Sequence, residues 1–215
     1  MGSTLPTLRN QVSSVPSTAI SKYLDATENR KIREDLVFAV QYVDEPKVAI
    51  DCGCGAGADI GFLVSNGFAV YGFDVEEESI SRCTARFHNV ADVHLSRSSF
   101  SSYNFPKASL VVADSSLFFC PKPEFADVWK NIYECLYPGG IFCGSFLGPE
   151  DTMAGPKYNA VDYWPEVSVF EDEEVKELFT NFEVLRFNVH RSSGSTPAGE
   201  LHDWHIFSIV AKKSG

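Results

Sequence analysis

The sequence predicts an α/β protein built on a doubly wound, mostly parallel seven-stranded sheet with an antiparallel C-terminal strand. Three observations support this prediction. Short apolar runs alternate with segments whose apolar residues recur every three or four positions, which indicates parallel strands covered by helices on both faces. A glycine cluster directly follows the first apolar run. No helical pattern separates the last two runs, and strands joined without a crossover helix are most simply antiparallel neighbours.

The length and composition fit one globular domain preceded by a short arm. Of 215 residues, 44% are hydrophobic and 22% are charged, which does not suggest disorder. We expect residues 1–16 to form a flexible arm and residues 17–215 a single domain. No apolar run approaches the roughly 20 residues that span a bilayer. Residues 1–16 also lack the apolar core of a signal peptide, so we expect a cytoplasmic protein.

Residues 17–44 are predicted to form the first helix. Ile32, Leu36, Ala39 and Val43 fall on one helical stripe, and Pro46 ends the pattern. The longest basic cluster of the chain, Asn29–Arg33, lies within this segment beside acidic residues. We interpret it as a solvated helix face.

The next elements alternate regularly. The apolar run 48–50 is the first strand, and a helix from about residue 59 ends at Asn66-Gly67, a common C-terminal signal. Residues 68–73 form the second strand. A helix at 77–88 follows, with glutamates in its first turn, where the helix dipole favours negative charge.

The second half of the chain continues this alternation and then breaks it. Its predicted strands cover residues 90–95, 109–113 and 141–146, and one helix carries the apolar stripe from Phe125 to Leu136. Another helix carries the stripe from Val175 to Phe182. The last two strands, about 183–189 and 203–212, are separated by a segment rich in Ser, Gly and Pro.

A glycine-rich loop after the first strand predicts a nucleoside-binding site. Asp51–Gly57 reads Asp-Cys-Gly-Cys-Gly-Ala-Gly, and doubly wound sheets bind ligands outside the carboxyl ends of their strands. By itself, a glycine loop fits nicotinamide, flavin or S-adenosylmethionine cofactors equally. The spacing G-x-G-x-G differs from G-x-G-x-x-G, and the Asp51 carboxylate would repel a pyrophosphate but could accept from an ammonium group. Asp74, at the end of the second strand, can accept hydrogen bonds from both ribose hydroxyls.

These motifs, together with Leu136–Ile141 (Leu-Tyr-Pro-Gly-Gly-Ile), resemble those of class I S-adenosylmethionine-dependent methyltransferases over residues 45–147. Within that superfamily the chain looks similar to compact bacterial enzymes of the tellurite-resistance and thiopurine type. The resemblance implies a Rossmann-like methyltransferase fold, S-adenosylmethionine as cofactor and a small-molecule acceptor. It implies that the donor is bound by Asp51, Gly53, Cys54 and Gly55 at its methionyl half, by Asp74 at the ribose, by Val75, Ser99 and Phe100 at the adenine, and by Asp114 near the methyl group.

Simpler interpretations of these residues remain open. Many relatives carry Asp where this chain carries Ser99. The glycines could serve only a strand-to-helix turn, and Asp74 could only cap the following helix. Asp114 could cap a turn, and Phe100 could belong to the core.

We expect the acceptor to bind where three loops, 114–122, 147–170 and 190–203, meet at the carboxyl edge of the sheet. The second is unusually long for a connection and carries Tyr158, Tyr163 and Trp164 as candidate substrate contacts. In the third, Arg191 could pair with an anionic group. The candidate catalytic residues are Asp114 and His202, with His202 as the general base if the acceptor must lose a proton.

The charge and the cysteines exclude other classes of partner. The net charge is -11 and no basic stripe is visible, so nucleic acid is not an expected partner. The six cysteines lack the spacing of metal ligands, so no metal is expected. We therefore predict an enzyme with a small-molecule substrate and without a membrane partner. The alternatives are a non-catalytic S-adenosylmethionine sensor and a nicotinamide-dependent oxidoreductase; the sequence leaves the oligomeric state open.

Overall fold

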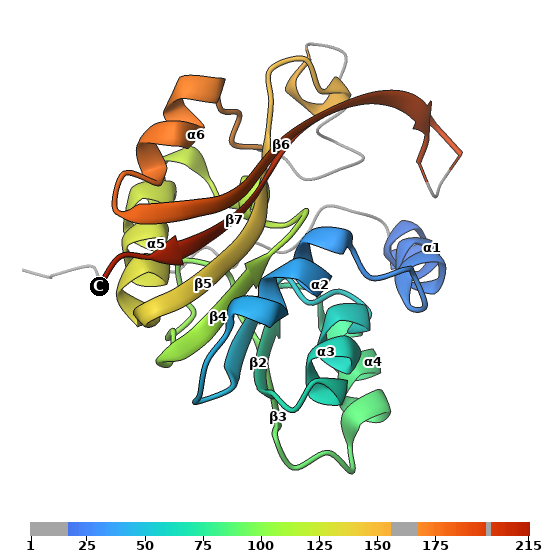
Figure 1. Ribbon diagram of the computed structural model, residues 1–215. Helices are drawn as coiled ribbons and strands as arrows, with labels where there is room; N and C mark the ends of the chain where they lie inside the picture. The colour runs from blue at the N-terminus through green and yellow to red at the C-terminus, as the bar shows by residue number, and fades with distance from the viewer. Residues whose placement is uncertain (1–16, 156–166, 197–198) are drawn as a thin grey trace, which may run out of the picture.

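Seven strands form one sheet in the computed structural model, which describes residues 17–155, 167–196 and 199–215. The strand order is β3-β2-β1-β4-β5-β7-β6 (Figure 1). Strands β1 to β5 pair in parallel, and β7 is antiparallel to both β5 and β6. The strands are β1 Val48–Cys52, β2 Ala69–Asp74, β3 Val93–Arg97, β4 Ala108–Ala113, β5 Leu136–Leu147, β6 Phe182–Ser195 and β7 Leu201–Lys213. This topology confirms the predicted fold class.

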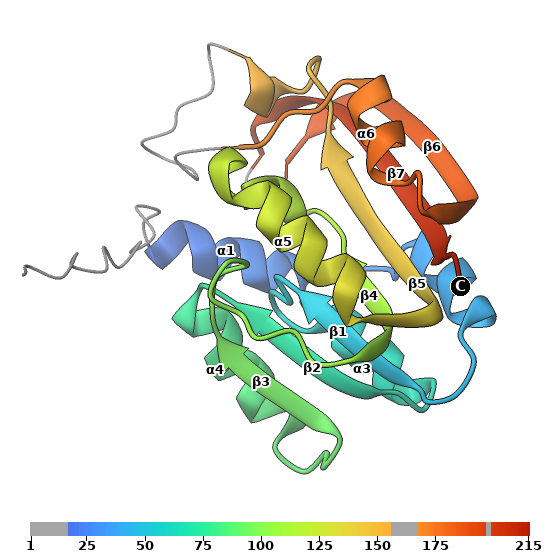
Figure 2. The same ribbon diagram turned by 90° about the vertical axis from the view of Figure 1, so that its left-hand side faces the viewer.

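Helices cover both faces of the sheet, and each face has its own apolar core (Figures 1 and 2). On one face α5 and α6 contribute Phe125, Ile132 and Val175. On the other, α2, α3 and α4 contribute Leu36, Ile60 and Cys83. The helices are α1 Ser17–Thr27, α2 Glu34–Ala39, α3 Ala58–Ser65, α4 Glu77–Phe87, α5 Lys122–Cys135 and α6 Asp172–Leu178, with short 3-10 turns at η1 Val40–Tyr42, η2 Leu117–Phe119 and η3 Thr152–Ala154.

The single helix predicted over residues 17–44 is wrong. Helix α1 ends at Thr27, and a linker of residues 28–33 leads to α2. The linker is held by tertiary contacts: Arg30 pairs with Asp59, and Arg33 pairs with Asp114. These contacts with α3 and with the end of β4 override the helical periodicity of the segment.

The predicted third strand, 90–95, is also shifted. Strand β3 covers Val93–Arg97 because residues 88–92 turn out of α4 first, with the Val90 N–H bonded to the Phe87 carbonyl at 2.9 Å.

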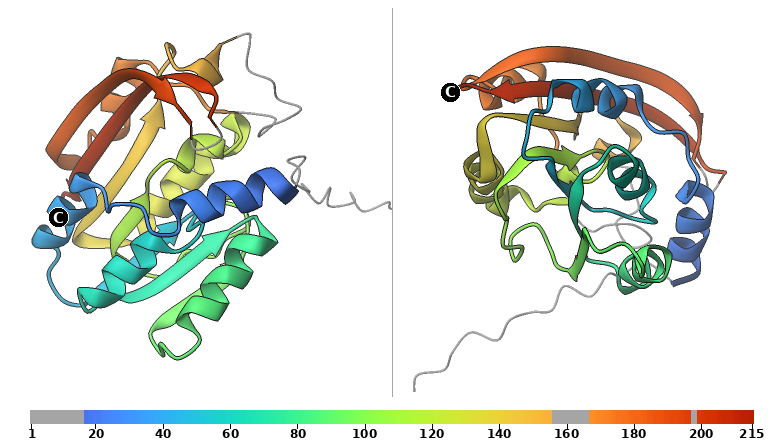
Figure 3. Two further views of the ribbon diagram at one scale, coloured as in Figure 1. Left: turned by 90° about the vertical axis from the view of Figure 1, so that its right-hand side faces the viewer. Right: turned by 60° about the horizontal axis from the view of Figure 1, so that its bottom comes forward.

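The connection predicted at 190–203 is largely strand. Strand β6 continues to Ser195 and pairs with β7 up to the Ser195–Leu201 pair. Strand β5 ends at Leu147, opposite Ile206, so the hairpin projects past the carboxyl end of β5. Its outer part lies on the same side of the molecule as α1 (Figures 1 and 3).

The predicted arm at residues 1–16 lies outside the described residues. Within the described ranges, no helix is long and apolar enough to cross a membrane.

Candidate functional site

The strand order places the candidate site at the carboxyl ends of β1, β2 and β4. Strand β1 lies between β2 and β4, and the order reverses between β1 and β4. In open α/β sheets this reversal is the position at which ligands bind. The loops that begin at Gly53, Val75 and Asp114 therefore meet at one place.

The glycine loop requires a backbone that other residues adopt poorly. Gly53, Gly55 and Gly57 all have positive φ angles, of 73°, 51° and 79°. A Cβ atom at Gly53 would lie 2.6 Å from the Ser116 Cβ, and one at Gly57 would lie 2.8 Å from the Phe87 ring. At Gly55 a Cβ atom would meet no described atom within 4 Å. Two of the glycines are thus explained by packing, whereas Gly55 faces open space that a ligand can approach.

Asp74 fastens this loop to the end of β2. Its Oδ2 accepts from the Gly55 N–H and its Oδ1 accepts from the Glu76 N–H, both at 2.9 Å. Burial raises the pKa of Asp74, while the hydrogen bonds from Glu76 and Gly55 lower it. Each carboxylate oxygen can accept a further hydrogen bond, so Asp74 can hold the loop and still bind hydroxyl groups of a ligand.

Asp51 is a buried carboxylate with an unsatisfied oxygen. The residue is only 4% exposed, and its Oδ2 has no hydrogen-bond partner among the described residues. Burial raises the pKa of Asp51 well above its ordinary value, and the charge of Asp59 raises it further. A buried carboxylate in this state favours a cationic partner, which fits the ammonium group of a methionyl moiety.

The turn after β4 is held by a residue that the sequence analysis missed. Arg33 forms an ion pair with Asp114 through its Nε, and its Nη2 donates to the Ser115 Oγ at 2.8 Å. Ser115 has a positive φ of 52°, which is uncommon outside glycine. Ser116 donates to the Cys52 carbonyl at 2.6 Å and so ties this turn to the glycine loop. The basic cluster Asn29–Arg33 was the available signal, but interpreting it as a solvated helix face was wrong for Arg33 and Arg30.

Helix α1 brings a tyrosine to the same edge. Tyr23 is 51% exposed, and desolvation of its hydroxyl raises its pKa. The charges of Arg30, Arg33, Asp114 and Asp74 also act on this hydroxyl. The pKa of this phenol is therefore sensitive to the charged groups of the same edge.

The predicted adenine contacts lie at the ends of β2 and β3. The Ser98 N–H donates to the Asp74 carbonyl at 2.9 Å, which brings the segment with Ser99 beside the ribose candidate. The Ser99 hydroxyl hydrogen-bonds to that of Ser102 at 2.8 Å. Phe100 packs edge-on against Phe73 at 5.3 Å, as a core residue does. Val75 offers its carbonyl to Arg97 at 3.0 Å.

The hairpin residues form a separate group. The His202 Nε2 lies 2.9 Å from Oδ1 of Asp151, a buried carboxylate that also accepts from the His205 N–H at 3.0 Å. Arg191 binds Glu150 through two hydrogen bonds, of 3.0 and 2.9 Å.

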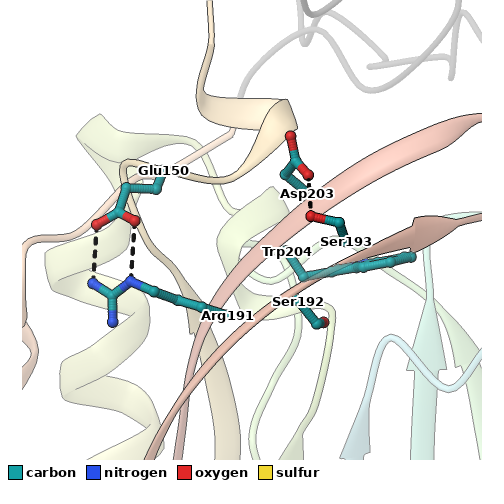
Figure 4. Close-up of a pocket in the computed structure, with 6 residues that line it drawn as sticks. All are labelled: Glu150, Arg191, Ser192, Ser193, Asp203 and Trp204. Carbon is teal, nitrogen blue, oxygen red and sulfur yellow. Dashed lines mark hydrogen bonds and ion pairs between the residues drawn. The ribbon is translucent and has the colours of Figure 1, made fainter.

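The Arg191–Glu150 pair, drawn in Figure 4, belongs to the lining of a surface depression. The volume of this depression is about 550 Å³. Its lining residues are Glu150, Arg191, Ser192, Ser193, Asp203 and Trp204. Among the described residues, no hydrogen bond or ion pair joins the hairpin group to Asp51, Asp74 or Asp114. Tyr158, Tyr163 and Trp164, the predicted substrate wall, lie outside the described residues.

In the part of the chain that the structure describes, no cluster of three or more His, Cys, Asp or Glu residues could hold a metal ion. All six cysteines are buried and none forms a disulfide.

Comparison with known proteins agrees with this geometry. Residues 49–140 match the family model described as a methyltransferase domain. The carboxy-S-adenosyl-L-methionine synthase of Actinobacillus pleuropneumoniae is 27% identical over 112 residues, which are 49% of this chain and 46% of that protein. The chain thus matches about half the length of its curated relatives.

Two solved structures share the fold. TehB from Haemophilus influenzae superposes with a TM-score of 0.71 at 18% identity, over 91% of this chain and 67% of that one. The 1,6-didemethyltoxoflavin-N1-methyltransferase of Burkholderia thailandensis, solved with bound 1,6-didemethyltoxoflavin and S-adenosylhomocysteine, gives a TM-score of 0.67 at 18% identity, over 100% and 94% of the two chains.

Proposed function

We propose that the protein is a class I S-adenosylmethionine-dependent methyltransferase that transfers a methyl group from S-adenosylmethionine to a small-molecule acceptor. The match of residues 49–140 to a methyltransferase-domain model and the fold shared with TehB support this proposal. The observation that carries the proposal is the arrangement of three residues at the switch point of the sheet. Asp51 presents an unsatisfied carboxylate oxygen, Gly55 faces open space, and Asp74 holds the loop between them.

The donor-binding residues divide by chemistry. Asp51 offers a negative charge for the methionyl ammonium, and the open backbone at Gly55 admits the donor close to the loop. Asp74 accepts from the ribose hydroxyls. Val75, Ser99 and Phe100 surround the adenine. When bound, S-adenosylmethionine supplies an electrophilic methyl group on a sulfonium, so the protein contributes mainly proximity and orientation.

We place the acceptor between α1 and the end of β4, beside Tyr23, Arg33 and Asp114. Arg33 and Tyr23 are both half exposed, whereas the Asp114 side chain is only 12% exposed. An acceptor in this position meets a phenol, a guanidinium and a carboxylate that can orient polar groups. Asp114 is the candidate residue for receiving a proton there.

The loops predicted from the sequence, 147–170 and 190–203, remain candidates for further contacts with the acceptor. His202 is held by Asp151, an arrangement that orients an imidazole for proton transfer but also fastens the outer part of the hairpin to the segment after β5. Arg191 would have to leave Glu150 before it could bind an anionic acceptor. Tyr158, Tyr163 and Trp164 stay predictions from the sequence.

The similar proteins support the proposed chemistry. One similar structure holds S-adenosylhomocysteine, and the curated relatives are synthases of a carboxylated S-adenosylmethionine. A small acceptor also fits the net charge of -11, which disfavours a polyanionic nucleic acid. We propose a cytoplasmic location, because the six cysteines are free in the structure and reduced thiols are typical of that compartment.

Calorimetric titration of the pure protein with S-adenosylhomocysteine and with NADH tests the cofactor. We expect binding of the first and none of the second; the reverse would refute the proposal in favour of an oxidoreductase. Transfer of a labelled methyl group to a panel of metabolites then separates an enzyme from a sensor, because a sensor binds the donor without turnover.

With an acceptor found by this screen, the Arg33→Ala and Tyr23→Phe variants test its position. Both should raise the KM for the acceptor more than the Kd for S-adenosylhomocysteine. Lys31→Ala is the matched control, since Lys31 lies on the same linker but is exposed and pairs only with Glu34, at 3.6 Å, in the described structure. An unchanged KM in both variants would move the acceptor site to the hairpin side.

A further inference from the structure

The turn after β4 stores backbone strain. Among the residues that the structure describes, Ser115 is the one non-glycine residue with a positive φ, at 52°. In this conformation the Cβ atom of an L-residue crowds a neighbouring carbonyl oxygen. Such strain persists only where the surrounding structure fixes the backbone, and it gathers at functional sites. The contacts that fix the turn 114–116 therefore bear on function.

Three contacts from three different segments hold this turn. Ser145 lies on β5, the neighbour of β4 in the sheet (Figure 2), and its Oγ accepts from the Ser115 N–H at 2.7 Å. Arg33, on the linker between α1 and α2, donates to the Ser115 Oγ at 2.8 Å. Ser116 donates to the Cys52 carbonyl at the end of β1, at 2.6 Å.

Only one of these contacts holds the strained backbone itself. The bonds from Arg33 and to Cys52 use side chains of the turn, and Arg33 is 51% exposed, so water can replace its bond. Ser145, in contrast, is fully buried and accepts from the main-chain N–H of the strained residue. Without this acceptor the N–H would lack its partner in a part-buried place, which favours a rearranged turn. Ser145 thus determines whether Ser115 keeps its positive φ.

The hold of Ser145 extends to Asp114. The Ser115 N–H belongs to the same planar peptide group as the Asp114 carbonyl, so the hydrogen bond from Ser115 to Ser145 also orients the backbone of Asp114. The Asp114 side chain is 12% exposed and pairs with Arg33. A displacement of about 1 Å in a reacting arrangement can lower the rate on the order of 100-fold. A turn that relaxes would therefore move the Asp114 carboxylate out of place.

We propose that Ser145 is a positioning residue for methyl transfer: its hydroxyl holds the turn 114–116 in the strained conformation that aims the Asp114 carboxylate at the acceptor. This proposal rests on the proposed function, which places the acceptor beside Asp114. Ser145 acts through the turn, because it is fully buried within β5.

The Ser145→Ala variant tests this role with an acceptor found by the turnover screen. Its kcat should fall by about tenfold or more, because the Asp114 carboxylate loses its fixed position. The Kd for S-adenosylhomocysteine should stay unchanged, because the proposed donor contacts lie on β1 and β2. Ser109→Ala is the matched control: Ser109 is also buried, but its hydroxyl donates to the Pro46 carbonyl at the opposite end of β4. It should keep the kcat of the parent protein.

A second change at Ser115 separates positioning from stability. Glycine adopts a positive φ without strain, so Ser115→Gly added to Ser145→Ala should raise kcat again, by about threefold or more. Ser115→Ala added to the same variant should not, because alanine keeps the strain. Both second changes remove the hydroxyl that Arg33 binds, so their difference reports the backbone alone.

The outcomes decide as follows. An unchanged kcat in folded Ser145→Ala, an equal loss of kcat in Ser109→Ala, or no recovery with Ser115→Gly would each overturn the proposal. If Ser145→Ala does not fold, Ser145→Cys replaces it, because a thiol fills the site but accepts hydrogen bonds only weakly.

A failure of the proposed function looks different. In that case the parent protein would not bind S-adenosylhomocysteine or would transfer no methyl group. Amide hydrogen exchange of residues 113–117 still tests the hold on the turn, since exchange should become faster in Ser145→Ala and not in Ser109→Ala. Equal exchange in both variants would show that Ser145 does not hold the turn.

Discussion

Replacing Asp74 with Ala should weaken donor binding by a predictable amount. The carboxylate accepts two backbone hydrogen bonds of 2.9 Å and, in the proposed complex, those of the ribose hydroxyls. Hydrogen bonds to a charged group contribute about 1.5–3 kcal/mol, but water competes for an exposed hydroxyl, so we expect a net loss of about 1–3 kcal/mol. This loss corresponds to a rise of about 5- to 150-fold in the Kd for S-adenosylhomocysteine, measured by calorimetry.

The same variant should also be less stable, because the N–H groups of Gly55 and Glu76 lose their acceptor. A loss of 1 kcal/mol lowers the Tm of a chain of this length by about 2–4 °C. Asp92→Ala is the control, since Asp92 is exposed and lies at the opposite edge of the sheet, just before β3. It should change neither the Tm nor the Kd.

A deoxyribose analogue separates the direct role of Asp74 from its role in the loop. An analogue of S-adenosylhomocysteine without one ribose hydroxyl should bind the parent protein more weakly than the complete ligand does. Asp74→Ala should lose this discrimination, because the partner of the hydroxyl is gone. If the variant still discriminates as strongly as the parent, or if its Kd is unchanged, the ribose assignment is refuted.

Three further predictions concern the loop and the hairpin. Gly55→Ala should lower stability by about 1–2 kcal/mol, because a residue with a Cβ atom is strained at a φ of 51°, and it should also raise the Kd for the donor. Gly199→Ala, at a φ of 88° on the hairpin, should lower stability without changing this Kd. An equal effect of both variants on the Kd would contradict the assignment of Gly55 to the donor site. Asp51→Asn should raise the Tm of the free protein at pH 8 but weaken donor binding. Folding raises the pKa of Asp51 above its ordinary value of 3.8, so ionisation of Asp51 lowers stability as the pH rises from 3.8 through the raised pKa. The gain in Tm should therefore vanish near pH 4, and a gain that does not depend on pH would contradict a raised pKa for Asp51. His202→Ala should lower stability by about 1–3 kcal/mol, because it removes a partner of the buried Asp151. His202→Gln should keep the stability of the parent protein, but it should keep turnover only if His202 is not the base. Full turnover in a folded His202→Ala variant would exclude the role of base.

The elements that sequence reasoning placed correctly are those with a local physical requirement. The glycines of the loop adopt positive φ angles, which few other residues tolerate, so their positions are visible in the sequence. Asp74 ends a buried strand, and parallel strands bring their carboxyl ends together, so its place beside the loop follows from topology. The reversed final strand follows from the missing crossover helix.

What the sequence did not reveal depends on contacts between distant segments. Arg33 lies in a segment with helical periodicity, and only the fold brings it to Asp114, 81 positions further along the chain. The segment 190–203 has the composition of a loop, yet cross-strand pairing with β7 makes most of it strand. The hydrogen bond from the Cys83 thiol to the Gly55 carbonyl also has no local signal, because β2 lies between these two residues in the chain.

The linker between α1 and α2 connects the donor site to the proposed acceptor site. Arg30 pairs with Asp59 at the start of α3, next to the glycine loop, and Arg33 pairs with Asp114 at the end of β4. Asp59 and Asp114 are largely buried, but Arg33 is 51% exposed, and an ion pair with an exposed partner contributes only about 0–1 kcal/mol. An acceptor that binds Arg33 or Asp114 can therefore break the ion pair between them with little loss of free energy. The same six-residue linker carries Arg30, so it holds both the start of α3, next to the glycine loop, and the turn after β4.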